Sequence, residues 1–195
     1  MRNKHTVPEI PTLEQIEAAR ERLQYNSKYR KTLRSTIGVL IVVAAIAILV
    51  ATLWMPVLQI YGSSMFPTLK DGQIVACVKG SHFETGELVA FYFGNKLLIK
   101  RVIGSPGDWI NIDEEGSVSV NGELLDEPYV TEKALGECSI KFPYQVPDER
   151  WFVMGDNRAV SVDSRSSQVG CVAQEQIVGK IVFRVWPVRE VGQIN

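Results

Sequence analysis

A lysine inside an apolar, β-rich run is the residue of this sequence best suited to chemistry. Lys100 lies in the stretch Leu97–Ile103, LLIKRVI, where strand alternation puts Leu98 and Val102 on its own face. A solvated lysine, with a pKa of about 10.4, is no proton acceptor at neutral pH. Burial disfavours the charged form and can lower this pKa by about 3–5 units. Lys100 is therefore either a candidate general base or a lysine whose stem packs while its amine reaches water.

A serine-containing loop supplies a group that such a base could activate. The segment 61–72, YGSSMFPTLKDG, follows a predicted strand, opens with Gly62 and contains Ser63 and Ser64. A neutral amine beside a serine hydroxyl makes a competent nucleophile, because the amine accepts the proton as the oxygen attacks. By themselves, two serines in a loop are typical turn residues, so this pair needs further support.

Other catalytic centres have little support in the sequence. Of the two histidines, only His82 lies in the body of the chain, in the polar loop KGSHFETGE, where a solvated side chain is expected. A Ser-His-Asp triad or a Cys-His pair is therefore not expected. Asp113 and Glu114 are typical of a solvated acidic turn. No Cys/His spacing indicates a metal site, so we expect neither a metal nor a cofactor.

The chain has three cysteines, an odd number. Cys77, in the apolar run IVACV, is predicted to be a small core residue. Cys138 and Cys171 could form one disulfide, and the sequence does not decide whether they do.

Charge is distributed very unevenly along the chain. Residues 1–35 carry eight Lys/Arg and four Glu, no charged residue occurs from Ser35 to Leu69, and residues 70–195 carry 13 basic and 18 acidic side chains. The neutral gap contains Ile37–Met55, IGVLIVVAAIAILVATLWM, which as a helix spans about 28 Å, close to the roughly 30 Å of a bilayer core. We expect a retained transmembrane anchor rather than a buried core helix or a removable signal peptide, whose basic leader is short.

The same charges predict the orientation of the anchor. Lys28, Arg30, Lys31 and Arg34 precede the apolar run, whereas no charge follows it until Lys70. The positive-inside rule then places residues 1–35 in the cytoplasm and the body outside the plasma membrane. The nearly balanced total charge gives no reason to expect a nucleic-acid partner.

The domain organisation follows from these patterns. We predict a cytoplasmic segment 1–35, a transmembrane helix 36–55 and an extracytoplasmic domain 56–195 with a small insertion at about 109–150. Thr12-Leu13-Glu14-Gln15 is a capping box and predicts a short amphipathic helix within the first segment.

Beyond Pro56 the pattern is that of an antiparallel β domain. Short β-rich runs alternate with turn signals, and SVSVNGELL, residues 117–125, predicts a hairpin with an Asn-Gly type I′ turn. Nothing alternates with helices, as a parallel sheet would require. The predicted strands are Val57–Tyr61, Gln73–Val78, Glu87–Phe93, Lys96–Ile103, Trp109–Ile112, Ser117–Val120, Trp151–Met154 and Ile177–Val185.

Three short motifs resemble a known family. SMFPT at Ser64–Thr68 is similar to the nucleophile motif of type I signal peptidases, which are membrane-anchored Ser/Lys endopeptidases. KRVIGSPGD at Lys100–Asp108 resembles their general-base motif, and GDNRAVSVDSR at Gly155–Arg165 resembles their third motif. Order, spacing and the preceding single anchor agree over residues 36–187. The resemblance implies a mainly β, signal-peptidase-type catalytic domain behind one transmembrane helix.

The resemblance also implies roles for particular residues. Ser64 would be the nucleophile, with its backbone N–H in the oxyanion hole, and Lys100 would be the base. Ser161 would hydrogen-bond the amine of Lys100, while Asp163 and Arg165 would form a structural ion pair. The remaining two positions, Ile60 and Ile99, would line pockets for small substrate side chains.

Two positions depart from the family pattern. Some members have a serine two residues before the nucleophile, whose hydroxyl completes the oxyanion hole, whereas this chain has Gly62, as other members do. Losing such a donor can cost a factor of about 10²–10³ unless another donor replaces it. Ala159-Val160 replaces a pair that is usually polar beside Ser161.

The expected function is removal of signal peptides from exported preproteins at the outer face of the plasma membrane, with cleavage after Ala-x-Ala. The partners would be preprotein signal peptides and the lipid bilayer, without nucleic acid or metal. Two alternatives remain: another Ser/Lys processing protease, or a non-catalytic membrane-tethered β domain that assists assembly. The presence of both Ser64 and Lys100 argues against the non-catalytic alternative.

Overall fold

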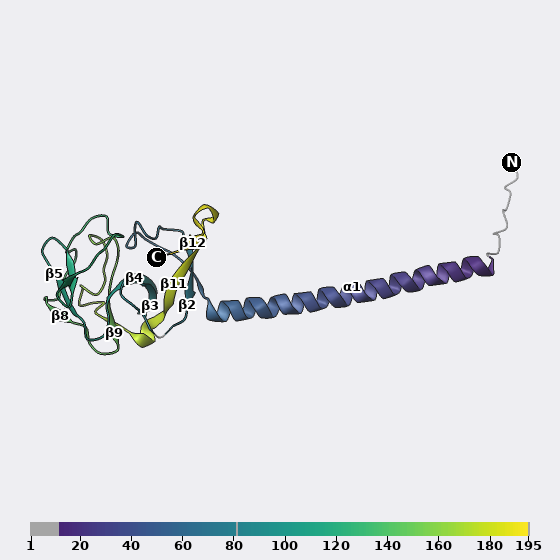
Figure 1. Cartoon of the computed structure of the whole chain (residues 1–195), viewed down its shortest axis with the longest axis horizontal. Coiled ribbons are helices and arrows are strands. Elements are labelled where there is room, and N and C mark those ends of the chain that lie inside the picture. Colours follow the sequence, from purple (N-terminus) through teal and green to yellow (C-terminus); the bar gives the residue numbers. More distant parts are fainter. Residues whose placement is uncertain (1–11, 81, 195) are drawn as a thin grey trace. The chain divides into compact units, whose positions relative to one another are not determined.

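The structure is a computed structural model that describes residues 12–80 and 82–194. The chain divides into two compact units, residues 1–50 and 51–195, and each is described by itself. Residues 13–50 of the first unit belong to one long helix, and the second unit is built mainly from two antiparallel sheets (Figure 1).

Helix α1 runs without interruption from Leu13 to Trp54. Its first turn has the predicted capping box, because the backbone N–H of Gln15 donates to Thr12 Oγ1 at 3.4 Å and that of Thr12 donates to Gln15 Oε1 at 3.1 Å. The prediction of a short, separate N-terminal helix is wrong. No proline occurs between Leu13 and Pro56, so the helix continues through the apolar run and ends just before Pro56.

One part of α1, Lys28–Ala51, is long and apolar enough to cross a membrane, judged by length and composition. Its mean hydropathy is 2.5, and none of this window is buried within the protein. A helix that hides its apolar side chains in a protein core would be buried, so the buried-core alternative does not fit this stretch. The chain therefore carries an N-terminal apolar helix suited to membrane anchoring.

The larger sheet carries most of the second unit. Its strands follow the order β1-β2-β11-β3-β4-β9-β10, and β12 pairs with β11. Every pairing is antiparallel, as the turn-rich sequence predicted. The strands are β1 (Val57–Gln59), β2 (Ile74–Val78), β3 (Leu88–Phe93), β4 (Lys96–Gly104), β9 (Arg150–Met154), β10 (Val172–Ala173), β11 (Ile177–Trp186) and β12 (Gly192–Gln193).

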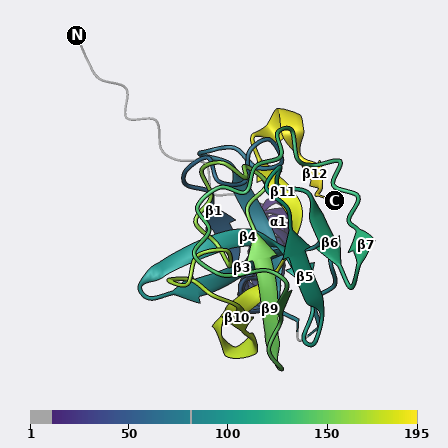
Figure 2. The ribbon, with the colours of Figure 1, turned by 90° about the vertical axis from the view of Figure 1, so that its left-hand side faces the viewer.

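The smaller sheet forms within the predicted insertion and has the order β7-β6-β5-β8. Its strands are β5 (Trp109–Ile112), β6 (Val118–Val120), β7 (Glu123–Leu124) and β8 (Tyr144–Gln145). The predicted type I′ turn joins β6 to β7, since Asn121 and Gly122 have φ values of 55° and 88°. Figure 2 shows β5 and β6 beside β9 of the larger sheet, and one buried cluster that includes Ile110, Val118 and Phe152 packs the two sheets together.

All eight predicted strands are present, with ends shifted by at most two residues. The three strands that the sequence did not indicate, β8, β10 and β12, have two residues each, too few to show a period. Two short 3₁₀ helices, Gln174–Gln176 and Val188–Glu190, flank β11. The prediction of a mainly β, antiparallel domain is confirmed.

Candidate active site

The side chains of Ser64 and Lys100 meet in the structure. Lys100 Nζ lies 2.8 Å from Ser64 Oγ, within hydrogen-bond distance, although the residues are 36 positions apart. Ser64 belongs to the turn between β1 and β2, and Lys100 lies in the middle of β4. Ser64 is half-buried, whereas Lys100 is only 3% exposed. The alternative in which the amine of Lys100 reaches into water does not apply.

Burial controls the protonation of Lys100. Loss of solvent, the largest influence, lowers the pKa of its amine below 10.5. The charges of Asp163 and Asp156 act in the opposite direction, and Arg165 lowers the pKa further. The net shift is downward, which favours the neutral amine that a general base requires.

The second cation of the run, Arg101, is 1% exposed on the opposite face of β4. It donates two parallel hydrogen bonds to Asp156, from Nε at 2.9 Å and from Nη2 at 2.8 Å. Nη1 donates to the carbonyl of Gly86 at 2.6 Å, and the carboxylate of Asp156 also accepts the hydroxyl of Thr68 at 2.5 Å. One carboxylate of the third motif therefore ties β4 to residues 61–72, the loop that carries the candidate nucleophile and is called the nucleophile loop below.

The nucleophile loop is closed by its own polar contacts. Gly62 has a φ of +87°, a conformation that side chains disfavour, and its N–H donates to Asp71 Oδ1 at 2.7 Å. The N–H of Gly72 donates to the carbonyl of Ile60 at 2.9 Å. Within residues 12–80 and 82–194, the backbone N–H of Ser64 has no acceptor and remains available to an incoming oxyanion. The N–H of Gly62 is not available in the same way, because it donates to Asp71.

The third motif approaches the nucleophile closely at Gly155. A Cβ on Gly155 would lie 2.5 Å from the carbonyl oxygen of Ser64 and would also collide with Ser161 Oγ. Two residues further on, the N–H of Asn157 donates to that same Ser64 carbonyl at 3.1 Å. Only glycine permits this approach, so Gly155 and Asn157 support the backbone at Ser64.

Ser161 does not make the hydrogen bond that the resemblance implied. Its side chain is buried, and Oγ has no hydrogen-bond partner among the described residues. The oxygen lies against Gly155, while the amine of Lys100 bonds to Ser64 instead. Ser161 is thus placed within the site, but it does not aim the base in this structure.

Asp163 and Arg165 form an ion pair, as expected. Both side chains are 0% exposed, and Arg165 donates to the carboxylate from Nε and from Nη2, each at 2.8 Å. Asp163 Oδ2 also accepts the N–H of Gly155 at 2.9 Å, and Arg165 Nη2 donates to the carbonyl of Ser161 at 3.3 Å. The pair fixes both ends of the motif's loop.

A pocket of about 570 Å³ opens beside Ser64 and Lys100. Ile60 and Ile99 both line it, and Ile60 is only 4% exposed. The remaining lining residues belong to the segment around β1 and to the first half of β4: Val57, Leu58, Gln59, Tyr61, Gly62, Met65, Lys96, Leu97 and Leu98. The site thus offers an apolar groove that ends at a serine and a buried amine.

The other candidate groups lie apart from this centre. His82 is exposed, and its side chain makes no hydrogen bond to any described residue. All three cysteines are free, so Cys138 and Cys171 are not bridged in this structure. Among the described residues no group of three His, Cys, Asp or Glu side chains could hold a metal ion.

The sequence analysis did not predict that Arg101 pairs with Asp156. It also did not identify Gly155 or Asn157 as residues that support the backbone of Ser64. A signal for the first pair was present, because a cation on the second face of an apolar strand requires a buried carboxylate. No local pattern marked the other two, since their role depends on contact with a loop about ninety positions earlier.

Comparisons with known proteins agree on one family. Residues 33–186 match the family described as "Signal peptidase, peptidase S26". The chain is 38% identical to "Signal peptidase IB" of Staphylococcus aureus over 151 residues, 67% of this chain and 78% of the relative. It is 37% identical to "Probable signal peptidase I-2" of Synechocystis over 145 residues, 68% of this chain and 64% of that relative.

A solved structure is also similar to part of the chain. The crystal structure of a signal peptidase I from Enterococcus faecalis covers 51% of this chain and 96% of its own, with 25% identity and a TM-score of 0.43.

Proposed function

Because the chain belongs to the signal peptidase family, peptidase S26, and is a serine peptidase by that membership, we propose that Ser64 is its nucleophile and Lys100 its general base. One observation carries the proposal: the amine of Lys100, 3% exposed and with a lowered pKa, stands 2.8 Å from Ser64 Oγ. A neutral amine at hydrogen-bond distance from a hydroxyl is the geometry that proton abstraction requires.

The reaction proceeds in two steps. Ser64 Oγ bonds to the carbonyl carbon of the scissile peptide as its proton passes to Lys100 Nζ. The C–N bond then breaks, and the proton leaves with the amine of the mature protein. Lys100 next takes a proton from water, whose oxygen attacks the acyl ester, and the proton returns to Ser64 as the signal peptide is released.

The oxyanion of the tetrahedral intermediate binds at the backbone N–H of Ser64. This group has no other acceptor among residues 12–80 and 82–194, whereas the N–H of Gly62 is held by Asp71. A preorganised backbone donor stabilises the charge that develops in the transition state.

The substrate binds as an extended strand in the groove. Among the described strands, β1 pairs only with β2, and residues Lys96–Lys100 of β4 pair only with β3. Both strands therefore present a free edge beside the pocket, which suits strand addition by a signal peptide. Ile60 and Ile99 limit the size of the side chains before the cut, so the preferred sequence is Ala-x-Ala.

The anchor places this groove at the outer face of the plasma membrane. The uncharged run Ile37–Met55 follows Lys28, Arg30, Lys31 and Arg34, so residues 1–35 face the cytoplasm. Protease added to right-side-out vesicles should digest the unit 51–195 and leave an N-terminal tag intact. Protection of the catalytic unit together with loss of the tag would reverse this topology.

The proposed activity can be tested on the full-length protein in detergent. A preprotein with an Ala-x-Ala site is incubated with wild type, Ser64→Ala, Lys100→Met and Ser63→Ala, and mass spectrometry locates the cut. Wild type and the matched control Ser63→Ala, which removes a neighbouring exposed hydroxyl, should cut after the second alanine. The other two variants should lose at least about 10³-fold in rate. Comparable cleavage by Lys100→Met would show that the proposed base is wrong.

A further inference from the structure

The segment between β7 and β8 contacts the third motif at several points. Residues 127–139, called the arm below, contain no strand or helix and connect two strands of the smaller sheet. No catalytic or pocket-lining residue lies in the arm. Buried Glu127 and half-buried Tyr129 nevertheless reach the arginines around Ser64 and Lys100.

Glu127 is the charged end of this arm. Its carboxylate is 0% exposed and forms an ion pair with Arg158, whose side chain is also fully buried. Arg158 Nη1 donates to Glu127 Oε2 at 3.2 Å, and Nη2 bonds to Oε1. The remaining nitrogen, Nε, donates to the carbonyl of Gly155 at 3.1 Å. Arg158 therefore links the arm to the glycine at which the third motif approaches Ser64.

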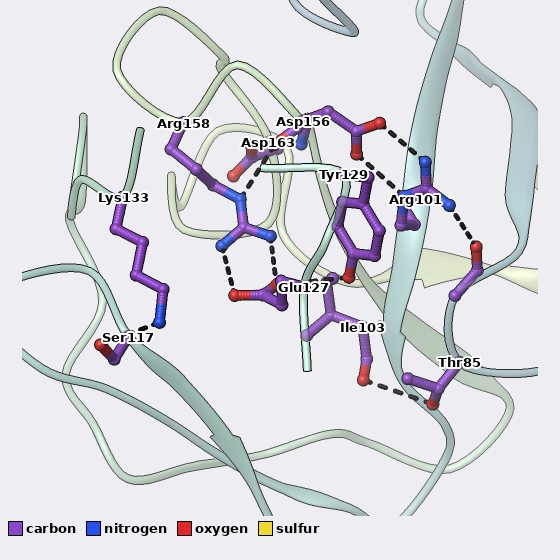
Figure 3. Close-up of polar contacts among 12 residues, drawn as sticks. Thr85, Arg101, Ile103, Ser117, Glu127, Tyr129, Lys133, Asp156, Arg158 and Asp163 are labelled. Carbon is purple, nitrogen blue, oxygen red and sulfur yellow. Dashed lines mark hydrogen bonds and ion pairs between the residues drawn. The ribbon is translucent and has the colours of Figure 1, made fainter. Parts of the chain in front are cut away.

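Tyr129 joins the same carboxylate to a second arginine (Figure 3). Its hydroxyl donates to Glu127 Oε1 at 3.3 Å, and its ring lies 3.8 Å from the guanidinium carbon of Arg101. Burial, followed by the charge of Glu127, raises the pKa of the Tyr129 phenol, which keeps its proton available for this bond. Arg101 in turn binds Asp156, the neighbour of Gly155.

The backbone of the arm completes the contact. Arg165 Nη1 donates to the carbonyl of Leu135 at 2.7 Å, and the carbonyl of Arg165 accepts the N–H of Ser139 at 2.9 Å. A Cβ on Gly136 would collide with the carbonyl oxygen of Arg158 and would lie 2.7 Å from Arg165 Nη1. The arm therefore packs against the loop with its backbone as well as its side chains.

Glu127 neutralises the buried charge of Arg158. The buried arginines Arg101, Arg158 and Arg165 each face one carboxylate, and those of Asp156 and Asp163 come from the third motif itself. Glu127 is the partner that the arm supplies, and it is the only one that Arg158 has among the described residues. Without Glu127, Arg158 would be a buried, unpaired charge, which is strongly unfavourable and would displace the residues around it.

We propose that the arm positions the catalytic loops, with Glu127 as a positioning residue that acts through Arg158 on Gly155 and Asn157. Because the N–H of Asn157 binds the carbonyl of Ser64, displacement of this segment moves the nucleophile relative to Lys100. The inference rests on the proposed Ser64–Lys100 pair and assigns a catalytic purpose to the insertion. A shift of Ser64 by less than 1 Å is enough to lower the rate measurably, because a positioning error of about 1 Å costs roughly 10²-fold.

The test compares Glu127→Gln with Asp126→Asn in the full-length protein in detergent. The first change removes the buried charge and keeps the shape. Asp126 is an exposed neighbour whose side chain makes no ion pair or hydrogen bond with any described residue. Active sites are counted with a serine-acylating inhibitor, so that misfolded protein does not contribute to kcat. We expect Glu127→Gln to lower kcat about tenfold with KM changed less than about twofold, because the arm lies outside the groove. Asp126→Asn should match wild type.

Two further variants separate positioning from general stability. Tyr129→Phe removes one hydrogen bond of Glu127 and retains the ring beside Arg101, so kcat should fall by only about threefold. Arg158→Gln should resemble Glu127→Gln, and the double variant should lose no more than either single change, because the two residues act as one unit.

Each outcome decides the question. If Glu127→Gln keeps the kcat of Asp126→Asn, or if its loss appears in KM instead, the inference is wrong. Should Glu127→Gln fail to fold, Tyr129→Phe decides, and a wild-type kcat in that variant overturns the inference. A failure of the proposed function gives a distinct result, because Ser64→Ala would then still cleave preprotein. That result would refute both the proposed function and this inference.

Discussion

Arg101 and Asp156 form a fully buried ion pair on the face of β4 opposite to Lys100. Two parallel hydrogen bonds of 2.9 and 2.8 Å join them, and the side chains are 2% and 1% exposed. The pair explains why an apolar strand carries two adjacent cations. Lys100, the proposed base, is buried away from solvent. Arg101 is neutralised by a carboxylate and holds together the loops around Lys100.

The Arg101–Asp156 pair should be a major determinant of stability. Asp156→Asn leaves Arg101 buried without a countercharge, so the free energy of unfolding should fall by about 3–5 kcal/mol. Denaturant unfolding of the detergent-solubilised protein measures this loss. The control is Lys70→Gln, which breaks an exposed pair with Glu190 at 3.6 Å and should cost less than about 1 kcal/mol. Equal effects of the two variants would contradict the structural role of the buried pair.

Peptidase activity should rise with pH as Lys100 loses its proton. Burial lowers the pKa of this amine below 10.5, so the neutral base is already populated at pH values where a solvated lysine remains charged. A plot of kcat/KM against pH should rise tenfold per pH unit and level off below pH 10.5. Lys100→Arg, which cannot lose its proton, should be inactive at every pH. A rise centred at 10.5 would mean that the amine is solvated.

The same lowered pKa should appear in the stability of the protein. The unfolded chain binds the Lys100 proton more tightly than the folded one, so wild-type stability rises with pH between the folded pKa and 10.5. Each pKa unit of depression costs the folded state about 1.4 kcal/mol at lower pH. Lys100→Met removes this cost, so its advantage over wild type should be largest below the folded pKa and should shrink as pH approaches 10.5. Unfolding curves at several pH values test this trend, and a difference independent of pH would refute it.

Gly155 should tolerate no side chain. A Cβ at this position would lie 2.5 Å from the carbonyl oxygen of Ser64, so Gly155→Ala must displace the nucleophile loop. We expect a loss of about 10²-fold in kcat and of about 1–3 kcal/mol in stability. The control Gly192→Ala meets no atom within 4 Å and should behave as wild type. A fully active Gly155→Ala enzyme would show that this close approach does not matter for catalysis.

The groove should become less selective when it is enlarged. Ile99 is half-buried in the pocket wall next to Lys100, so Ile99→Ala adds room without removing a fully buried core residue. The variant should cut preproteins with valine in place of alanine before the scissile bond about tenfold faster than wild type does. The measurement is kcat/KM for the two substrates side by side. An unchanged preference would remove Ile99 from the specificity pocket.

Local sequence predicted the elements well. Alternation and turn residues located all eight longer strands, because the period of two and the Gly, Pro and Asn punctuation act over a few residues. The Asn121-Gly122 turn is likewise a short-range feature, and it is present. The Asp163–Arg165 ion pair, which the family resemblance implied, is present as well. The end of the first helix was misjudged because no local stop signal separates its polar start from its apolar run.

The sequence by itself thus determined the helix, the antiparallel strands, the three motifs and the two residue types that a Ser/Lys peptidase needs. Tertiary structure alone decided that Lys100 is buried and lies 2.8 Å from Ser64, that Ser161 Oγ makes no hydrogen bond to this amine, and that Glu127 reaches the third motif. The reason is physical: strand and turn preferences are encoded in neighbouring residues. Burial, pKa shifts and ion pairs arise between segments that are distant in sequence and meet only when the sheets have packed.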